Sequence, residues 1–456
     1  MSNLFKRCPA AVLAVAAAAV VVSLPARGMT LDEALADAYA NNPQLAAARA
    51  AQRKVDEGIP QALAQGRPTV QAQAGVGATN GATTASNSAN GSQTETRVGP
   101  IGAVSLNVPV WTGGREASAL SGAKARVQAG LATLRGTEQD VLLRAATAYV
   151  DVLRAQKVVD VDQSHERELE RELSSAKRRA EAGELRRPDV AATEAQAAQG
   201  RARLTQAQGD LDLAKQVFAG VVGAEPNHLQ PARLPPSLPA MRDEALAASA
   251  DSPTLAAARY TVDAAHDAIR SARAQMAPSL AAIGSLGYPV SSGELVLNIP
   301  LLDGGLAESQ ARGAKQELAQ RRLELDGQQI AARQDAVTAW QSLQTARASL
   351  EADQTQVAAA RASRDGLARE AAQGLRTQLE VLGSEQRLLD AELALAAANH
   401  DEIVGAYRLL AATGRLTAQD LGLKVAPYDP AQYSATSGAP LWDPAQVGRA
   451  YREMLP

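Results

Sequence analysis

Two stretches of the chain are nearly alike and lie 191 residues apart: SLNVPVWTGG at 105–114 and VLNIPLLDGG at 296–305. Each is an alternating apolar run followed by a proline, a pair of glycines and a long Ala-rich segment. Other segments repeat in the same order, since DEALADAYANNPQLAAAR at 32–49 returns as DEALAASADSPTLAAAR at 243–259. Self-similarity over such a period predicts two collinear copies of one structural unit.

The repeat divides the chain into five segments. We expect a signal peptide at 1–28, a first repeat at 29–222, a linker with five prolines at 223–241, a second repeat at 242–415 and a C-terminal tail at 416–456. Each repeat is expected to contain a helix, two strands, a very long helix and a further helix. In the first repeat the strands and later helices are expected over 69–79, 100–110, 114–182 and 187–222, and in the second over 279–287, 293–301, 305–373 and 376–413.

The first residues have the features of a secretory signal peptide. Lys6 and Arg7 precede an apolar run, which ends at the small-x-small triplet Ala26-Arg27-Gly28. A membrane anchor is the alternative, but the run is short and Ala-rich and ends at a cleavage-like site. The only cysteine, Cys8, precedes the apolar run. We therefore expect an exported chain that starts near Met29, is not lipidated and forms no disulfide.

The long segments are predicted to be helices. Hydrophobic residues make up 46% of the chain but aromatic residues only 3%, which suits closely packed helices better than a thick globular core. Neither 114–182 nor 305–373 contains a proline, and both are rich in strong helix formers. About 70 residues at 1.5 Å each would give a rod of about 100 Å. The net charge of −3, without a basic cluster, argues against nucleic acid as a partner.

The strands alternate in a way that is typical of membrane β-strands. In 102–110, Val104, Leu106 and Val108 lie on one face, opposite Ser105 and Asn107. A half-buried soluble sheet would give the same pattern, so the strands alone leave both readings open. Four strands cannot close a barrel, and an open sheet edge cannot face lipid. A membrane location therefore requires several chains to pool their strands.

The chain resembles the TolC family of outer-membrane efflux and secretion channels. The resemblance rests on the two DEAL openings, the two LN(V/I)P…GG stretches, the glycines Gly183 and Gly374, and the ending YRLLAATGRLTAQDLGL at 407–423. It implies a membrane α+β fold with an internal two-fold repeat. Three chains would form a homotrimer whose twelve-stranded β-barrel, four strands per protomer, continues as an α-helical coiled-coil tunnel in the periplasm.

The resemblance also implies a function. The channel would be the passive exit duct of a tripartite export system in the outer membrane, in contact with its lipids. It would receive substrate from an inner-membrane ABC or proton-driven pump through a periplasmic adaptor protein. The segment LGLKVAPYDPAQY at 421–433 resembles the type I protein secretion branch, which we favour slightly over small-molecule efflux. A periplasmic coiled-coil adaptor or scaffold is the alternative from another class.

Several residues correspond to the periplasmic gate of the family. Glu380 matches an inward-facing aspartate, and three copies would form an acidic ring that raises its own pKa values. Gly383 stands where a second ring would lie, and Ala371 where the family has a tyrosine. Arg376 and Asp189 match the arginine and carboxylate that link neighbouring coils. The alternative for these charges is an ordinary solvated surface.

Two further sets of residues are predicted to matter for shape and contact. Tip residues expected to contact the adaptor are Gly183, Leu185, Gly374 and Leu375. Strand-to-helix joints are expected at Pro109, Gly113, Gly114, Pro300, Gly304 and Gly305, because proline ends a strand and glycine permits a sharp turn.

Nothing in the sequence points to an enzyme, a cofactor or a metal. The four histidines are far apart, and none has a second ligand at the spacing of H-E-x-x-H. Neither a P-loop nor a G-x-S-x-G motif occurs. We therefore expect a channel without catalytic residues.

Overall fold

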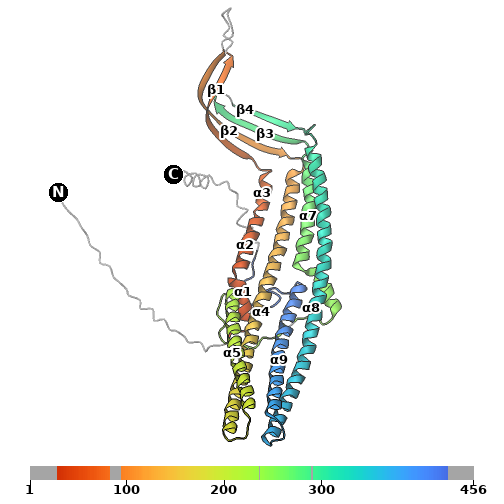
Figure 1. The fold of residues 1–456 in the computed structure, drawn as a ribbon. Helices are drawn as coiled ribbons and strands as arrows, with labels where there is room; N and C mark the ends of the chain where they lie inside the picture. The colour runs from red at the N-terminus through yellow and green to blue at the C-terminus, as the bar shows by residue number, and fades with distance from the viewer. Residues whose placement is uncertain (1–27, 83–93, 236, 289–290, 430–456) are drawn as a thin grey trace, which may run out of the picture.

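The structure is a computed structural model that describes residues 28–82, 94–235, 237–288 and 291–429. The expected signal peptide and the last part of the C-terminal tail lie outside these residues. The chain is elongated, with a four-stranded sheet at one end (Figure 1). Long helices run from the sheet to the other end, where one turn in each repeat connects the long helix to the helix that follows it. Among the described helices, none is both long and apolar enough to cross a membrane.

Each repeat has the same order of elements. The first consists of α1 (Leu31–Asn41), α2 (Pro43–Asp56), α3 (Gly58–Ala64), β1 (Thr69–Ala82), β2 (Thr94–Trp111), α4 (Arg115–Glu181) and α5 (Arg187–Val222). The second consists of α6 (Arg242–Ala248), the short 3₁₀ helix η1 (Ser249–Asp251), α7 (Pro253–Ala274), β3 (Ser279–Tyr288), β4 (Ser292–Asn298), α8 (Leu306–Ala372) and α9 (Gln378–Ala412).

The segment before each pair of strands is broken rather than one helix. Asn42 caps α2 by accepting from the backbone N–H groups of Gln44 and Leu45, and Pro43 takes the first helical position. Proline suits this position because it has no N–H to leave unsatisfied. Pro253 begins α7 in the second repeat in the same way. The NNP and DSP sequences thus place the same break in both copies.

The strands form one antiparallel sheet in the order β1-β2-β3-β4. Its centre is the pairing of β2 with β3, which joins the two repeats, with Leu106 opposite Gly284. Strands β1 and β4 pair on one side only. The sheet in a single chain therefore has two open edges.

Several strand ends differ from the sequence-based prediction, most of all in β2 and β4. Strand β2 begins at Thr94 and runs to Trp111, so Pro109 lies inside it, where the register with β3 shifts between Pro109 and Trp111. Strand β4 ends at Asn298, so Pro300 lies beyond it. Proline has no ladder donor and is tolerated at such a shift. Strand β4 ends at Asn298 because that residue is opposite Ser279, where its partner β3 begins.

The helices pair into two hairpins. Helices α4 and α8 have 67 residues each, which at 1.5 Å per residue is ~100 Å. In the half nearest the sheet they pack with α7, and in the other half α4 packs on α5 and α8 on α9 (Figure 1). Helix α9 also contacts α4, which joins the two hairpins.

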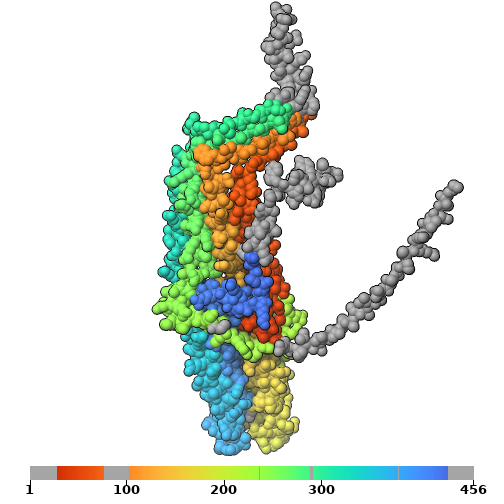
Figure 2. All heavy atoms as spheres, turned by 180° about the vertical axis from the view of Figure 1, so that it is seen from behind, coloured from red at the N-terminus to blue at the C-terminus, as the bar shows by residue number. Residues whose placement is uncertain are grey.

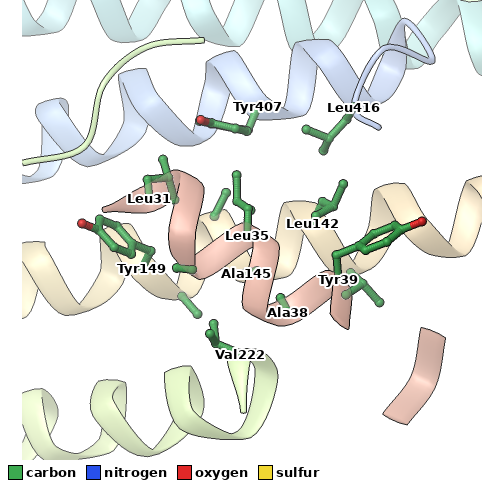
Figure 3. Packing of buried hydrophobic residues seen from close by; sticks show 14 of the residues in the cluster. Leu31, Leu35, Ala38, Tyr39, Leu142, Ala145, Tyr149, Val222, Tyr407 and Leu416 are labelled. Atoms are coloured by element: carbon green, nitrogen blue, oxygen red, sulfur yellow. The ribbon is translucent and has the colours of Figure 1, made fainter. Parts of the chain in front are cut away.

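The main hydrophobic core lies at mid-length, where most of the elements meet. Leu35 of α1, and Leu142 and Tyr149 of α4, are fully buried there, and Tyr407 of α9 packs in the same cluster (Figure 3). Phe218 of α5 is also fully buried in this cluster. The linker and the end of the described chain wrap the rod at the same level (Figure 2). The Tyr149 hydroxyl lies 2.8 Å from the Met29 carbonyl oxygen and 2.7 Å from that of Gln230. This core ties the start of the described chain and the linker to the rod.

Candidate functional site

The joints between sheet and helix are built on paired glycines in the left-handed backbone region. Gly113 and Gly114 have φ of 63° and 85°, and Gly304 and Gly305 have φ of 69° and 86°. Residues other than glycine rarely adopt such backbone angles. At Gly113 a Cβ atom would also lie 2.6 Å from the Cβ of Ala277. The chain therefore turns from strand to helix by the same backbone device in both repeats.

The two joints differ in how the following helix is capped. Asp303 accepts from the backbone N–H of Gly305 at 2.9 Å and of Ala307 at 2.8 Å, which satisfies free donors at the start of α8. At the matching position, Thr112 accepts through its backbone carbonyl oxygen, from the backbone N–H and the Nε of Arg115. The side chain at this position therefore acts as a cap in the second repeat only.

This difference predicts unequal effects of alanine at the two joints. Asp303→Ala removes two hydrogen bonds from the first turn of α8 and should lower the thermal unfolding midpoint by a few degrees. Thr112→Ala is the matched control and should leave the midpoint unchanged, because its carbonyl oxygen remains. Thermal unfolding followed by circular dichroism distinguishes the two. Equal effects of both changes would contradict the capping role of Asp303.

The sheet carries large apolar side chains that are exposed in a single chain. Val104 and Leu106 of β2 are 44% and 41% exposed, and Leu295 and Leu297 of β4 are 65% and 57% exposed. An exposed apolar face of this kind marks a surface that meets lipid or protein. If this surface meets lipid, further strands from other chains must complete the sheet, because lipid offers no hydrogen bonds to its open edges.

At the far end of the rod, the hairpin turns use glycine as a helix stop. Gly183 and Gly374 have φ of 78° and 75° and follow α4 and α8. The backbone N–H of Glu184 donates to Arg179 O, and that of Leu375 donates to Glu370 O. This is the usual way in which a left-handed residue satisfies the last carbonyls of a helix. The turns are therefore built by capping within each hairpin.

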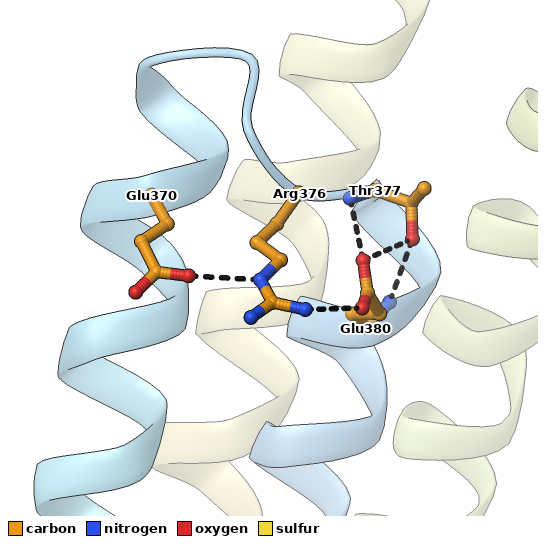
Figure 4. Close-up of polar contacts among 4 residues, drawn as sticks. All are labelled: Glu370, Arg376, Thr377 and Glu380. Atoms are coloured by element: carbon orange, nitrogen blue, oxygen red, sulfur yellow. Dashed lines mark hydrogen bonds and ion pairs between the residues drawn. The ribbon is translucent and has the colours of Figure 1, made fainter.

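Arg376 is the centre of a charged network in the α8–α9 turn (Figure 4). Its Nε lies 2.8 Å from Oε2 of Glu370, and its Nη1 lies 3.1 Å from Oε1 of Glu380. Glu380 Oε2 also accepts from the backbone N–H of Thr377 at 2.8 Å and from its hydroxyl at 2.9 Å. The guanidinium thus links the end of α8 to the first turn of α9.

Three comparisons with known proteins agree on what this arrangement is. A profile of the family described as outer membrane efflux protein matches residues 34–224 and 246–415. The chain is 32% identical over 446 residues to the outer membrane efflux protein BepC of Brucella suis biovar 1, which covers 94% of this chain and 96% of BepC. The chain belongs to the outer membrane efflux protein family. This is the TolC family that the sequence resembles.

More distant matches fit the same assignment. The alkaline protease secretion protein AprF of Pseudomonas aeruginosa is 26% identical over 315 residues, covering 64% of this chain and 65% of AprF. The solved structure of the Campylobacter jejuni CmeC outer membrane channel aligns with a TM-score of 0.74 at 13% identity, covering 90% of this chain and 89% of that one. The second match bears on the fold alone.

Membership explains the open sheet. TolC-family channels are trimers, so three chains pool their strands into a barrel in the outer membrane, and the long helices form a tunnel in the periplasm. The chain is thus the outer-membrane exit duct of a tripartite export system, and it is not an enzyme. The adaptor-or-scaffold alternative is excluded.

The link expected between Arg376 and Asp189 joins neighbouring coils and stays a prediction. Within the described residues of one chain, Arg376 pairs with Glu370 and Glu380 and not with Asp189. The reason is reach, because both glutamates lie on the same hairpin, six and four residues from Arg376. Asp189 lies exposed in the first turn of α5. There a carboxylate complements the helix dipole.

The acidic ring expected at Glu380 needs three chains and stays a prediction. In a single chain the pKa of Glu380 is lowered, not raised, first because the Thr377 N–H and hydroxyl donate to the carboxylate and then because Arg376 adds a positive charge. Repulsion within a ring of three copies would act against this. Thr377 and Glu380 form a capping box at the start of α9. The sequence TQLE at 377–380 carries this signal, and Thr377 and Glu370 are the tip residues that the sequence analysis missed.

Of the tip residues expected to contact an adaptor, Leu375 is 70% exposed and Leu185 is half-buried. The neighbouring Leu379 is 69% exposed and was not singled out from the sequence. At Gly383 a Cβ atom would meet nothing within 4 Å, so the missing carboxylate there is not a matter of space.

Proposed function

We propose that this channel is the exit duct of a type I protein secretion system, in which an ABC exporter and an adaptor deliver a polypeptide into the tunnel. The observation that carries the proposal is the similarity of the chain to AprF, a protein named for the secretion of alkaline protease, at 26% identity over 64% of this chain. The segment at 421–433, which resembles the type I secretion branch, adds support, and its described part is held against α1 and α2. Tyr428 donates its N–H to the Tyr39 hydroxyl at 3.1 Å, and the Arg49 guanidinium lies 4.5 Å from the ring centre of Tyr39.

Small-molecule efflux is the second candidate, because BepC is named an efflux protein and matches over 94% of this chain. In both cases the duct is passive and the inner-membrane pump supplies the energy. The pump and adaptor then determine most of the substrate specificity.

We further propose that the tip is the gate. The Arg376 network holds α8 and α9 together at their turn, and the exposed Leu375 beside it offers an apolar contact for the adaptor, together with Leu185 and the tip glycines Gly183 and Gly374. Asp189, on the turn of the other hairpin, supplies a carboxylate that Arg376 reaches only when neighbouring tips meet in the closed trimer. Docking of the adaptor would separate the tips.

Deletion of the gene, with complementation by the intact chain, separates the two candidates. For type I secretion we expect one or more proteins to disappear from the culture supernatant while sensitivity to dyes and detergents changes little. Cross-linking in intact cells, followed by purification of the duct, should then recover an ABC exporter and its adaptor. Unchanged secretion together with a marked rise in drug sensitivity, and recovery of a proton-driven transporter, would contradict the proposal.

A further inference from the structure

The two hairpins of the chain meet along one seam, where α9 packs against α4. Near the tip the apolar part of the seam is small. It consists of Leu169 and Leu173 of α4 with Leu382 of α9, and Ala197 of α5 beside them. Because little apolar area holds the hairpins together here, charged groups in the same seam have a large influence on whether it stays closed.

Two glutamates face each other in this seam. Glu385 of α9 is 6% exposed, and the carboxyl group of Glu172 on α4 lies close enough to interact with it. A hydrogen bond between two carboxyl groups requires a proton on one of them. Burial raises the pKa of Glu385, and the charges of Glu172 and Glu168 raise it further, while Arg364 of α8 opposes them.

The other charged groups around the pair are largely engaged with one another. Glu385 lines a cavity of about 370 Å³ that is also lined by His165 and Arg171 of α4, Arg361 and Arg364 of α8, and Glu392 of α9. Arg361 binds Glu392 at 2.6 Å, and Arg171 binds Glu168 at 2.7 Å. Burial and the nearby Arg203 lower the pKa of His165, which disfavours its charged form.

A second titrating contact lies higher in the same seam. His400 of α9 has a side chain that is 12% exposed, with Nε2 at 2.9 Å from Asp151 of α4 and Nδ1 at 2.8 Å from Asp401. The pKa of His400 is raised, first by its hydrogen bond to Asp151 and further by Asp401, against the effect of burial. Arg408 is the other charged residue lining the adjoining pocket, and the α8 residues that line it are uncharged.

We propose that the α4–α9 seam is a pH-responsive latch that holds the two hairpins together in acid and loosens as the pH rises. At acidic pH the proton shared by Glu172 and Glu385 joins the helices, and charged His400 bridges two aspartates. At alkaline pH the carboxylates of buried Glu385 and half-buried Glu172 repel each other, and the histidine bridge loses its charge. The consequence for conduction rests on the proposed gating function, since separation of the hairpins would widen the tip.

The sign is the same for both contacts. Each group has a pKa that is raised in the folded chain, so each favours the closed seam fully below its ordinary pKa and loses that effect as the pH rises through the raised value. The pH range over which the seam loses this stabilisation begins at the ordinary carboxyl pKa of 4.5 for Glu385 and at the ordinary histidine pKa of 6.5 for His400.

Hydrogen exchange on the intact trimer in detergent tests the latch. We compare wild type with Glu385→Gln at about pH 5.5 and about pH 9, because a ratio taken at one pH removes the intrinsic pH dependence of exchange. Peptides from both sides of the seam should exchange alike at the lower pH. At the higher pH the wild type should exchange about tenfold faster or more, since each unit of pKa shift corresponds to a factor of ten.

Three further variants sharpen the test. Glu172→Gln neutralises the pair from the α4 side and should reproduce Glu385→Gln, which guards against a packing defect in either variant. His400→Gln should show the opposite pattern, with faster exchange than wild type at the lower pH only. Glu402→Gln is the matched control, because Glu402 lies on α9 but pairs with Arg347 of α8 at 3.4 Å. It should match wild type at both values.

If Glu385→Gln and Glu172→Gln exchanged at the same rate as wild type at both pH values, the latch would be overturned. Single-channel recordings of the same proteins separate this proposal from the gating function. If exchange responds as expected but conductance does not change with pH, the latch stands and the gating role of the tip fails.

Discussion

Replacing Arg376 with alanine is expected to raise the single-channel conductance of the reconstituted trimer several-fold. The guanidinium is the cation that joins Glu370 at the end of α8 to Glu380 in the first turn of α9. Its loss leaves two carboxylates facing each other across the turn, and like charges repel. The turn should therefore open and widen the narrow end of the tunnel.

Two controls separate this effect from a general loss of positive charge. Arg369→Ala removes an exposed arginine of α8 whose Nε donates to a backbone carbonyl oxygen, that of Asp365, and it should leave the conductance unchanged. Arg376→Lys should fall between wild type and alanine, because one ammonium group cannot span both carboxylates as a guanidinium does. Asp189→Ala should raise the conductance only if Asp189 meets Arg376 between neighbouring tips. Wild-type currents from Arg376→Ala would refute the gate.

Replacing Phe218 with alanine is expected to lower the free energy of unfolding by about 3–5 kcal/mol, as for other large buried aromatic residues. Phe218 is fully buried in the core at mid-length, and its ring centre lies 6.2 Å from that of Tyr149. The resulting cavity would loosen α5 from α4 and α1, which share this cluster. Chemical unfolding of the purified protein, followed by circular dichroism, measures the change.

Phe218→Leu is the control for this prediction, since it keeps an apolar side chain and should cost less than about 1.5 kcal/mol. A loss with alanine as small as that with leucine would mean that the neighbouring side chains collapse into the space. The core would then contribute less to holding the linker and the start of the described chain than its burial indicates.

Much of this fold could be predicted because its signals are local in the sequence. Helix formers without proline over 114–182 and 305–373 indicate the rods, which the structure places at Arg115–Glu181 and Leu306–Ala372. Alternation and paired glycines indicate the strands and the joints. The strand ends were less accurate, since β2 and β4 stop where their pairing partners stop. Pairing depends on residues that are distant in the chain.

At the tip, too, some features could be predicted from the sequence and others could not. The glycine stops follow from composition and spacing, and the TQLE capping box at 377–380 could have been read in the sequence. The pairing of Arg376 with Glu370 could not be predicted from the sequence, because it depends on how the turn between α8 and α9 folds back. The contacts between α4 and α9 are even harder to predict from the sequence, because they bring together residues that are more than 200 positions apart, Glu172 with Glu385 and Asp151 with His400.

The sequence alone therefore determined the two-fold repeat, the long helices, the four strands per chain and the family, because each is encoded by neighbouring residues or by ordered motifs. The tertiary structure decided which charges meet. Whether a carboxylate meets an arginine, a capping N–H or a second carboxylate depends on distances between helices, and these distances reverse the direction of its pKa shift. Glu380 and Glu385 lie five residues apart, yet the pKa of the first is lowered and that of the second is raised.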